Sequence, residues 1–276
     1  MFDSREVAPD IVRILMARRF LWRDLYPASC YVLRKAGILV DSGSSRFSRQ
    51  TLSEARRFGI QTILLTHAHE DHMGGASLIS ETLGAQCLAH PDAIPALSNP
   101  STLKMHRYRK FLFGVPRACR AKSLEVGGHF VSEGARLRVI HAPGHSPDHV
   151  VFFDEEKGWL FGGDAFIPTR DKVFFGVGCD LASWIETLRS LSQLKPTLMF
   201  TGMGVISRRP SKVLTEKANR LSDTAGQVIG LWGRGLNEKQ IARELFPKDR
   251  SVRWVTGGDF SASNFVRACL RSGQTV

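Results

Sequence analysis

The first two thirds of the chain alternate between short apolar runs and amphipathic segments. The stretch "ASCYVLRKAGILVDSGSS" predicts a hairpin, because two β-rich runs flank residues 35–37. The runs "QTILLTH" and "AQCLAHP" predict two further strands. The segments "SRQTLSEARRFG" and "GGASLISETLG" predict helices, with Ser48 as an N-cap and with Gly59 and Gly84 just past the two helix ends. This order of strands and helices indicates an α/β alternation.

The pattern continues after an interruption. The runs "ARLRVIHAP", "HVVFFDE", "GWLFGGDAF" and "PTLMFTGM" predict four later strands. Between the last two, "DLASWIETLRSLSQL" predicts an amphipathic helix with Asp180 as its N-cap. The apolar positions of this helix recur at helical spacing: Leu181, Trp184, Ile185, Leu188 and Leu191.

From about residue 210 the predicted elements are helical only. The segments are "SKVLTEKANRLSDTAGQVIGLWG", "NEKQIARELF" and "SASNFVRACLRS". We therefore expect a first domain over residues 1–207 and a second, helical domain over residues 208–276.

Composition places the chain among globular proteins. Hydrophobic residues make up 43% and charged residues 23% of its 276 positions. No apolar run approaches the roughly 20 residues of a membrane-spanning helix, and residues 1–10 do not have the pattern of a secretory signal. The five cysteines are scattered without a C-x-x-C pair. Free thiols and a cytoplasmic protein, with no membrane partner, are the expectation.

The net charge of +12 is unevenly distributed. Residues 204–276 hold 13 basic and 6 acidic residues, which gives +7 of the total. The segment 92–123 interrupts the α/β pattern and has no acid after Asp92, whereas seven Lys or Arg residues interleave with Tyr108, Phe111 and Phe113. Such a basic, aromatic cap suits an anionic substrate or RNA, and a solvated helix with a buried aromatic stripe is an equal alternative.

A cluster of metal-binding side chains follows the run "QTILLTH". His67, His69, Asp71 and His72 fall within six positions, directly beyond a predicted strand. Imidazole and carboxylate groups are the ligands expected for zinc, iron or manganese. The spacing therefore predicts a metal site at the end of this strand.

Several motifs in order resemble the metallo-β-lactamase superfamily. "HAHEDH" resembles its H-x-H-x-D-H signature, "HAPGHSPDH" its Pro-Gly-His segment and "LFGGDAF" its Gly-Asp segment. The resemblance covers roughly residues 25–205 and is closer to the glyoxalase II-like branch than to secreted lactamases. It implies an α+β fold, a four-layer αββα sandwich with the metal site at the strand ends. Residues 208–276 resemble the small winged-helix-like domain of the β-lactamase-like protein 2 branch.

The resemblance also implies two metal sites. The first would use His67, His69 and His145. The second would use Asp71, His72 and a histidine after the last strand, with Asp164 bridging both metals. In "FTGMGV", however, Met203 stands at the place of that histidine, and a thioether is a weak ligand for zinc. Three alternatives follow: a weakly bound second metal, a single-metal enzyme, or a degenerate, non-catalytic site.

The implied activity is hydrolysis by a metal-activated water. Asp71 is the expected catalytic group, which orients the nucleophile or moves a proton. Zn2+ is the expected cofactor, with iron or manganese as alternatives, and oxidation by an iron-dependent relative is a further option within the superfamily. We expect a small anionic ester or thioester substrate, such as a coenzyme A or glutathione conjugate. Single-stranded RNA cleavage is the first alternative, and a non-catalytic nucleic-acid-binding protein is the second.

The remaining candidates have weaker support. His149 is expected either to orient a metal ligand or to be structural. His90 and His141 end predicted strands and are expected near the mouth of the site. Cys179 is expected to be structural.

Overall fold

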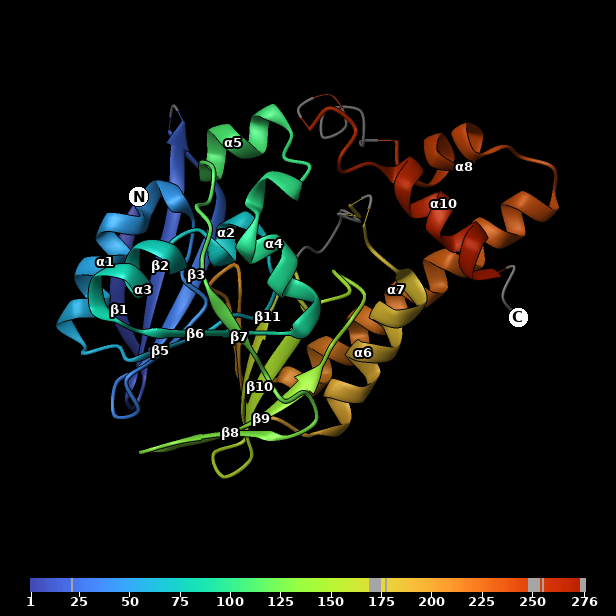
Figure 1. Ribbon diagram of the computed structural model, residues 1–276. Helices are drawn as coiled ribbons and strands as arrows, with labels where there is room; N and C mark the ends of the chain where they lie inside the picture. The colour runs from blue at the N-terminus through green and yellow to red at the C-terminus, as the bar shows by residue number, and fades with distance from the viewer. Residues whose placement is uncertain (21, 169–174, 177, 248–253, 255, 274–276) are drawn as a thin grey trace.

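The computed structural model places two β-sheets between layers of helices (Figure 1). It describes residues 1–20, 22–168, 175–176, 178–247, 254 and 256–273. In this part of the chain, the first sheet has the strand order β1-β2-β3-β4-β5-β6-β7 and the second the order β13-β12-β11-β10-β9-β8.

The first sheet changes from antiparallel to parallel along its width. Strands β1 to β4 pair antiparallel, and β4 to β7 pair parallel, because helical crossovers separate the later strands. The bounds are β1 (Phe2–Ala8), β2 (Ile11–Phe20), β3 (Arg23–Leu33), β4 (Ile38–Val40), β5 (Thr62–Leu64), β6 (Gln86–Ala89) and β7 (Ala121–Ser123). The predicted hairpin is β3 and β4, in which Tyr31 pairs with Val40.

The second sheet is antiparallel except between β11 and β12. Its bounds are β8 (His129–Ser132), β9 (Ala135–His141), β10 (Val150–Asp154), β11 (Trp159–Gly163), β12 (Leu198–Thr201) and β13 (Ile206–Ser207). The four strands predicted in this half of the chain are confirmed.

Successive side chains of a strand point to opposite faces of its sheet, and the interior is therefore divided into three hydrophobic clusters. In β4, Ile38 and Val40 pack between the two sheets, whereas Leu39 faces the helices α1 (Ser48–Arg57) and α3 (Ala76–Leu83). In β10, Phe152 packs between the sheets, and Val151 points to the opposite side. Three interior layers require four structural layers, so the αββα sandwich is confirmed.

The boundaries of the helices confirm most of the expected caps. Gly84 ends α3 in the left-handed conformation, with φ of 69°. Asp180 caps α6 (Leu181–Gln193), and its carboxylate accepts a hydrogen bond from the Ser183 N–H at 2.7 Å. The prediction of Ser48 as an N-cap is wrong. The short turn η1 (Ser45–Phe47) runs directly into α1, so Ser48 is already helical and Phe47 takes the cap position.

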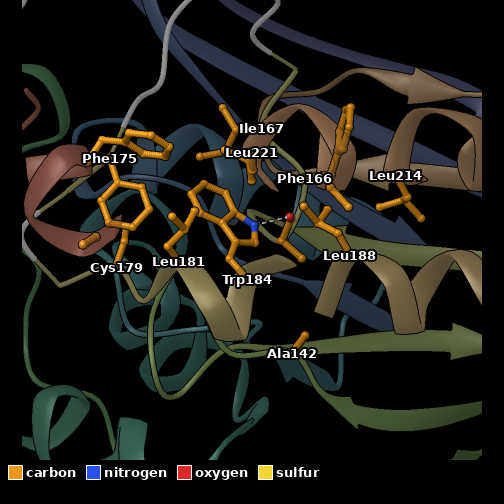
Figure 2. Close-up of a cluster of buried hydrophobic side chains, with 14 of the residues drawn as sticks. Ala142, Phe166, Ile167, Phe175, Cys179, Leu181, Trp184, Leu188, Leu214 and Leu221 are labelled. Carbon is orange, nitrogen blue, oxygen red and sulfur yellow. Dashed lines mark hydrogen bonds between the residues drawn. The ribbon is translucent and has the colours of Figure 1, made fainter. Parts of the chain in front are cut away.

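Helix α6 joins the second sheet to the C-terminal helices. Trp184 is buried, and its indole N–H donates a hydrogen bond to the Ala165 carbonyl at 2.7 Å (Figure 2). Around it lie Leu188 of α6 and Leu214 and Leu221 of the next helix, α7 (Pro210–Gly233). This cluster continues to α8 (Glu238–Leu245) and α10 (Ala262–Gly273), so the C-terminal helices share a core with the second sheet.

The proposed boundary between residues 207 and 208 falls between β13 and α7 and stays a prediction. The described residues after it form helices and turns, so a wing of β-strands is not among them. Within the described residues, no helix combines the length and apolar character that crossing a bilayer requires. All five cysteines are buried free thiols.

Candidate metal centre and its pocket

The loops at one edge of the two sheets bring the six predicted ligands together. His67 and His69 follow β5, and the short helix α2 (Glu70–Met73) continues this segment. The β9–β10 loop and the end of β11 supply the other ligands. The structure groups His67 with His69 and His145, and also with His72 and Asp164, as two sets of side chains that can hold a metal ion. Asp71 lies beside the second set.

Three imidazoles converge on one point. Nδ1 of His69 lies 2.9 Å from Nε2 of His67 and 2.9 Å from Nε2 of His145. Burial lowers the pKa of all three histidines, and repulsion from neighbouring histidines lowers it further for His67 and His69. Neutral imidazoles can offer nitrogen lone pairs to a cation, which fits a metal site.

Asp164 lies between the two groups of ligands. Its Oδ2 is 3.7 Å from Nε2 of His145, and its Oδ1 is 3.6 Å from Nε2 of His72. Oδ2 of Asp71 lies 3.8 Å from the same His72 nitrogen. One carboxylate oxygen therefore faces each group, a position from which Asp164 would reach metal ions in both groups.

Two buried polar atoms of the predicted ligands lack a hydrogen-bond partner in the part of the chain that the structure describes. Asp164 Oδ1 and His145 Nδ1 are buried and have no hydrogen-bond partner among the described residues. Burial opposes ionisation of Asp164, but His72 and His145 outweigh it and hold its pKa far below the usual range. A buried, ionised carboxylate beside several imidazoles fits a divalent cation such as zinc.

Asp41 supports both halves of the centre from behind, a role that the sequence analysis missed. Its Oδ2 lies 2.8 Å from Nδ1 of His72, and its carboxylate accepts hydrogen bonds from the backbone and hydroxyl of Thr66. The Thr66 hydroxyl lies 3.0 Å from Nδ1 of His67. In the arrangement that satisfies these contacts, both histidines place a proton on Nδ1 and turn Nε2 toward the metal site.

The carboxylates also control the charge of His72. Burial alone disfavours its charged form, but the carboxylates of Asp41, Asp164 and Asp71 outweigh burial and raise its pKa well above the ordinary value. This half of the centre is therefore strongly acidic, and it attracts a cation when His72 is a neutral ligand.

Two further residues position the ligand loops. Asp148 accepts a hydrogen bond from the Ala68 N–H at 2.8 Å, between the first two histidines. His149 accepts one from the Asp164 N–H at 3.1 Å through Nε2. His149 was expected either to orient a metal ligand or to be structural, and this contact favours the first alternative. The sequence patterns did not predict this role of Asp148.

Met203 lies where the backbone comes close to the centre. A Cβ at the preceding Gly202 would lie only 2.2 Å from Oδ1 of Asp164, so only glycine fits there. Met203 is partly buried, lines the pocket and packs against the cluster of α6 and the second sheet. Met203 therefore provides a thioether side chain in the loop next to the predicted metal ligands.

The first sheet fixes this loop. Hydrogen bonds run from Tyr31 to the Thr201 carbonyl at 2.6 Å, from the Ser29 N–H to Gly202 at 2.6 Å, and from Arg13 to Gly204 at 3.0 Å. The backbone at Met203 is therefore held by contacts that do not depend on its side chain.

A cavity of about 500 Å³ opens onto the centre and is lined by His69, Asp71, His145 and Asp164. Segment 92–123 forms part of its wall, both through α5 (Arg107–Phe113) and through residues before it, as expected for a cap. Of the seven basic residues predicted there, Lys104 and Arg109 line the cavity. Tyr108 and Phe113 also line it, whereas Phe111 is 43% exposed and stacks under Arg18 at 3.5 Å.

The other candidates occupy different places. His90 and His141 stack on each other with ring centroids 4.9 Å apart, and the described lining of the cavity does not include them. The prediction that they line its mouth therefore has no support.

Cys179 lines the cavity, and its thiol donates a hydrogen bond to the His145 carbonyl at 3.4 Å. Burial raises the pKa of Cys179 to about 12, so the thiol stays protonated and fits a structural role.

Comparison with known proteins agrees with this arrangement. The profile of the metallo-beta-lactamase superfamily matches residues 23–202, and the chain belongs to this superfamily of metal-binding hydrolases. A beta-lactamase-like protein 2 homolog from Drosophila melanogaster is 28% identical over 222 residues, which cover 75% of this chain and 68% of that protein.

Two other comparisons add detail. An atrochrysone carboxyl ACP thioesterase from Aspergillus fumigatus is 26% identical over 235 residues, which cover 81% of this chain and 65% of that protein. The chain thus spans about two thirds of the length of both relatives. The solved structure of a metallo-beta-lactamase family protein from Thermus thermophilus has a TM-score of 0.73 at 21% identity and covers 97% of this chain and 95% of its own. This likeness supports the fold.

Proposed function

We propose that the protein hydrolyses a thioester or a related acyl ester with a water activated at the metal centre. The convergence of His67, His69 and His145 with Asp164 on the floor of a cavity carries this proposal. A relative named as a thioesterase supports the choice of an acyl substrate.

The chemistry divides between the cation and the side chains. A bound divalent cation supplies Lewis acidity and makes water nucleophilic at neutral pH. The histidines and Asp164 hold the cation and fix where substrate and water meet. Asp71 lines the cavity beside them, and burial raises the pKa of its carboxyl, which favours the uptake of a proton.

We assign Asp71 the role of positioning water and moving its proton. The water oxygen forms a bond to the acyl carbon, the carbon–sulfur bond breaks, and Asp71 passes the proton to the leaving sulfur. The products are a carboxylic acid and a thiol. Zinc is the proposed metal, held firmly by the three-histidine side and weakly by the side that contains Met203.

A panel of thioesters and lactones tests this function. We expect turnover in the wild type after loading with Zn2+ and none in His67→Ala. Absence of turnover across the whole panel, in protein with a full metal complement, would overturn the acyl assignment.

Single-stranded RNA cleavage is the second candidate. The observation in its favour is the exposed outer side of α5, where Arg107 and Lys110 flank the partly exposed ring of Phe111. Cleavage of single-stranded RNA that is lost in His67→Ala would replace the acyl assignment. RNA binding that survives this mutation, without any turnover, would instead favour a nucleic-acid-binding protein.

A further inference from the structure

We propose that the cavity contains a binding site for a neutral, apolar acyl group, and that Phe260 in the C-terminal region sets the size of the group it accepts. This inference rests on the hydrolase function proposed above and names its class of substrate.

The larger apolar side chains of the described lining come from four separate parts of the chain. These parts are segment 92–123, the loop after β11, the loop after β12 and the loop before α10. Their larger apolar side chains at the cavity are Leu103, Met105, Phe113, Ile167, Met203 and Phe260. A cavity of about 500 Å³ with such a lining, beside a few convergent polar groups, is typical of a small-molecule site.

The buried charged groups on the described lining, outside the metal centre, are already paired. Arg109 forms a two-pronged ion pair with Glu70, with one contact at 2.8 Å, and its Nη1 lies 3.6 Å from Oδ2 of Asp259. The Tyr108 hydroxyl donates to the same Asp259 oxygen at 2.6 Å. Glu70 is 2% exposed and Asp259 is 8% exposed, so water does not screen these contacts.

Among the residues that the structure describes, the two other charged residues on the lining, apart from the metal centre and Asp148, are exposed. Lys104 is exposed, and the side chain of Asp92 is 68% exposed. A charged acyl group would therefore lose its hydration in the interior without gaining a counter-ion from the described lining, which is costly. The described part of the lining thus favours a neutral acyl group.

The wall formed by Phe260 is held in place on its own loop. The Phe260 N–H donates to the Thr256 hydroxyl at 3.3 Å, and that hydroxyl donates back to the Phe260 carbonyl at 3.1 Å. Asn264, at the start of α10, donates to the carbonyl of Asp259 at 2.8 Å and of Gly258 at 3.2 Å. The backbone beside Phe260 is therefore held by hydrogen bonds to Thr256 and Asn264.

The same loop is tied to the metal-binding motif. Asp259 contacts Arg109, Arg109 contacts Glu70, and Glu70 directly precedes Asp71 in the chain. This series of contacts fixes the separation between Phe260 and the reacting centre. A wall at a fixed distance from the scissile bond selects acyl groups by length.

The test is hydrolysis of N-acetylcysteamine thioesters with saturated acyl groups from acetyl to decanoyl, since this thiol carrier is uncharged. We expect kcat/KM to rise by about 4-fold per methylene, the equivalent of ~0.8 kcal/mol of buried surface, until the cavity is full, and then to fall. A succinyl thioester, which carries a charge, should react at least about tenfold more slowly than the butyryl thioester.

Phe260→Ala tests the wall itself. The ratio of kcat/KM for decanoyl over butyryl should rise by about tenfold or more, because two further methylenes at about 4-fold each then have room. Phe111→Ala is the matched control, since this ring is partly exposed and outside the described lining; it should leave the ratio unchanged. Phe260→Leu provides the same test, with a smaller shift, if the alanine variant does not fold.

Two results would overturn the inference: a kcat/KM that does not depend on acyl length, or an unchanged ratio in a folded Phe260 variant. Failure of the hydrolase function itself is distinguished by thioether analogues, in which a methylene replaces the carbonyl. If no thioester is hydrolysed but these analogues bind more tightly with length by calorimetry, the apolar site stands and the reaction is wrong. Length-independent or absent binding would remove the site as well.

Discussion

The three-histidine side and the aspartate side of the centre stand at the same edge of the sheets, yet they offer a cation different sets of donor atoms. His67, His69 and His145 converge within 2.9 Å contacts as neutral nitrogen donors. On the other side, the nearest contacts of His72 with Asp71 and Asp164 are 3.8 and 3.6 Å. One side is a compact set of donors, and the other is a looser set with more negative charge.

Met203 adds to this contrast, because it follows Gly202 beside Asp164 and His72 and carries a thioether, a weak donor for zinc. The loop around it is fixed by hydrogen bonds from the first sheet, and Gly202 leaves room for Asp164. The fold therefore keeps the backbone in place whatever side chain follows Gly202. What is reduced is the number of strong donors, so we expect metal affinity and not folding to respond to this position.

The largest effect is expected from His67→Ala, because His67 belongs to both groups of donors. We expect kcat/KM to fall by more than about 10³-fold, since the cation contributes several kcal/mol to the reaction. Elemental analysis should show less than one equivalent of metal. His129→Ala is the control, because His129 pairs with Glu155 away from the centre. Wild-type activity in His67→Ala would contradict the assignment of the centre.

The next effect tests the role of Asp71. In Asp71→Asn we expect kcat to fall by about 10²–10⁴-fold, as for the loss of a general base. The three-histidine side should keep its metal, and the activity should lose its acid limb in a pH–rate profile. Asp92→Asn, at an exposed carboxylate on the rim, should change neither quantity. Loss of the firmly bound metal in Asp71→Asn would show a structural role in place of proton transfer.

The same contrast marks what the sequence can predict. The ligand motif, the strands that precede it and the caps at Gly84 and Asp180 are local features, and each follows from residue spacing. The prediction for Ser48 failed because a preceding turn, which has no strong signal, continues into the helix. Strands β1 and β2 were not predicted, because their residues mix polar and apolar types without a clear pattern. Their strand structure depends on pairing, of β1 with β2 and of β2 with β3.

The supporting residues of the site could not be predicted for a different reason. Asp41 meets His72 across 31 positions, and Asp259 meets Tyr108 across 151. Near Asp41 the sequence "DSGSS" resembles an ordinary turn, and nothing in it specifies a distant histidine. Such contacts come from the packing of the layers, which local sequence patterns do not encode.

Met203→His should remove the difference between the two sides. We expect the wild type to hold about one equivalent of metal and the variant two, by elemental analysis of protein purified without added metal. The affinity for the second metal equivalent should rise by more than roughly 10–100-fold. That is the effect of changing a residue that supports a metal ligand without binding the metal itself. Met203→Leu, which has a similar volume and no donor, should match the wild type. Two equivalents in the wild type would mean that another side chain completes the second site.

The smallest effect concerns Asp41, and it is best measured in the two-metal Met203→His protein. Asp41→Asn preserves the shape of the side chain and suits the left-handed backbone there, with φ of 59°. An amide N–H₂ opposite Nδ1 of His72 cannot accept its proton, so the proton moves to Nε2 and blocks the ligand position. We expect the second equivalent to bind about 10–100-fold more weakly in a chelator titration. The first equivalent should change less, because the hydroxyl of Thr66 stands between Asp41 and His67. Equal weakening of both equivalents would show that Asp41 supports the two sides alike, and the distinction between them would then lie in Met203 alone.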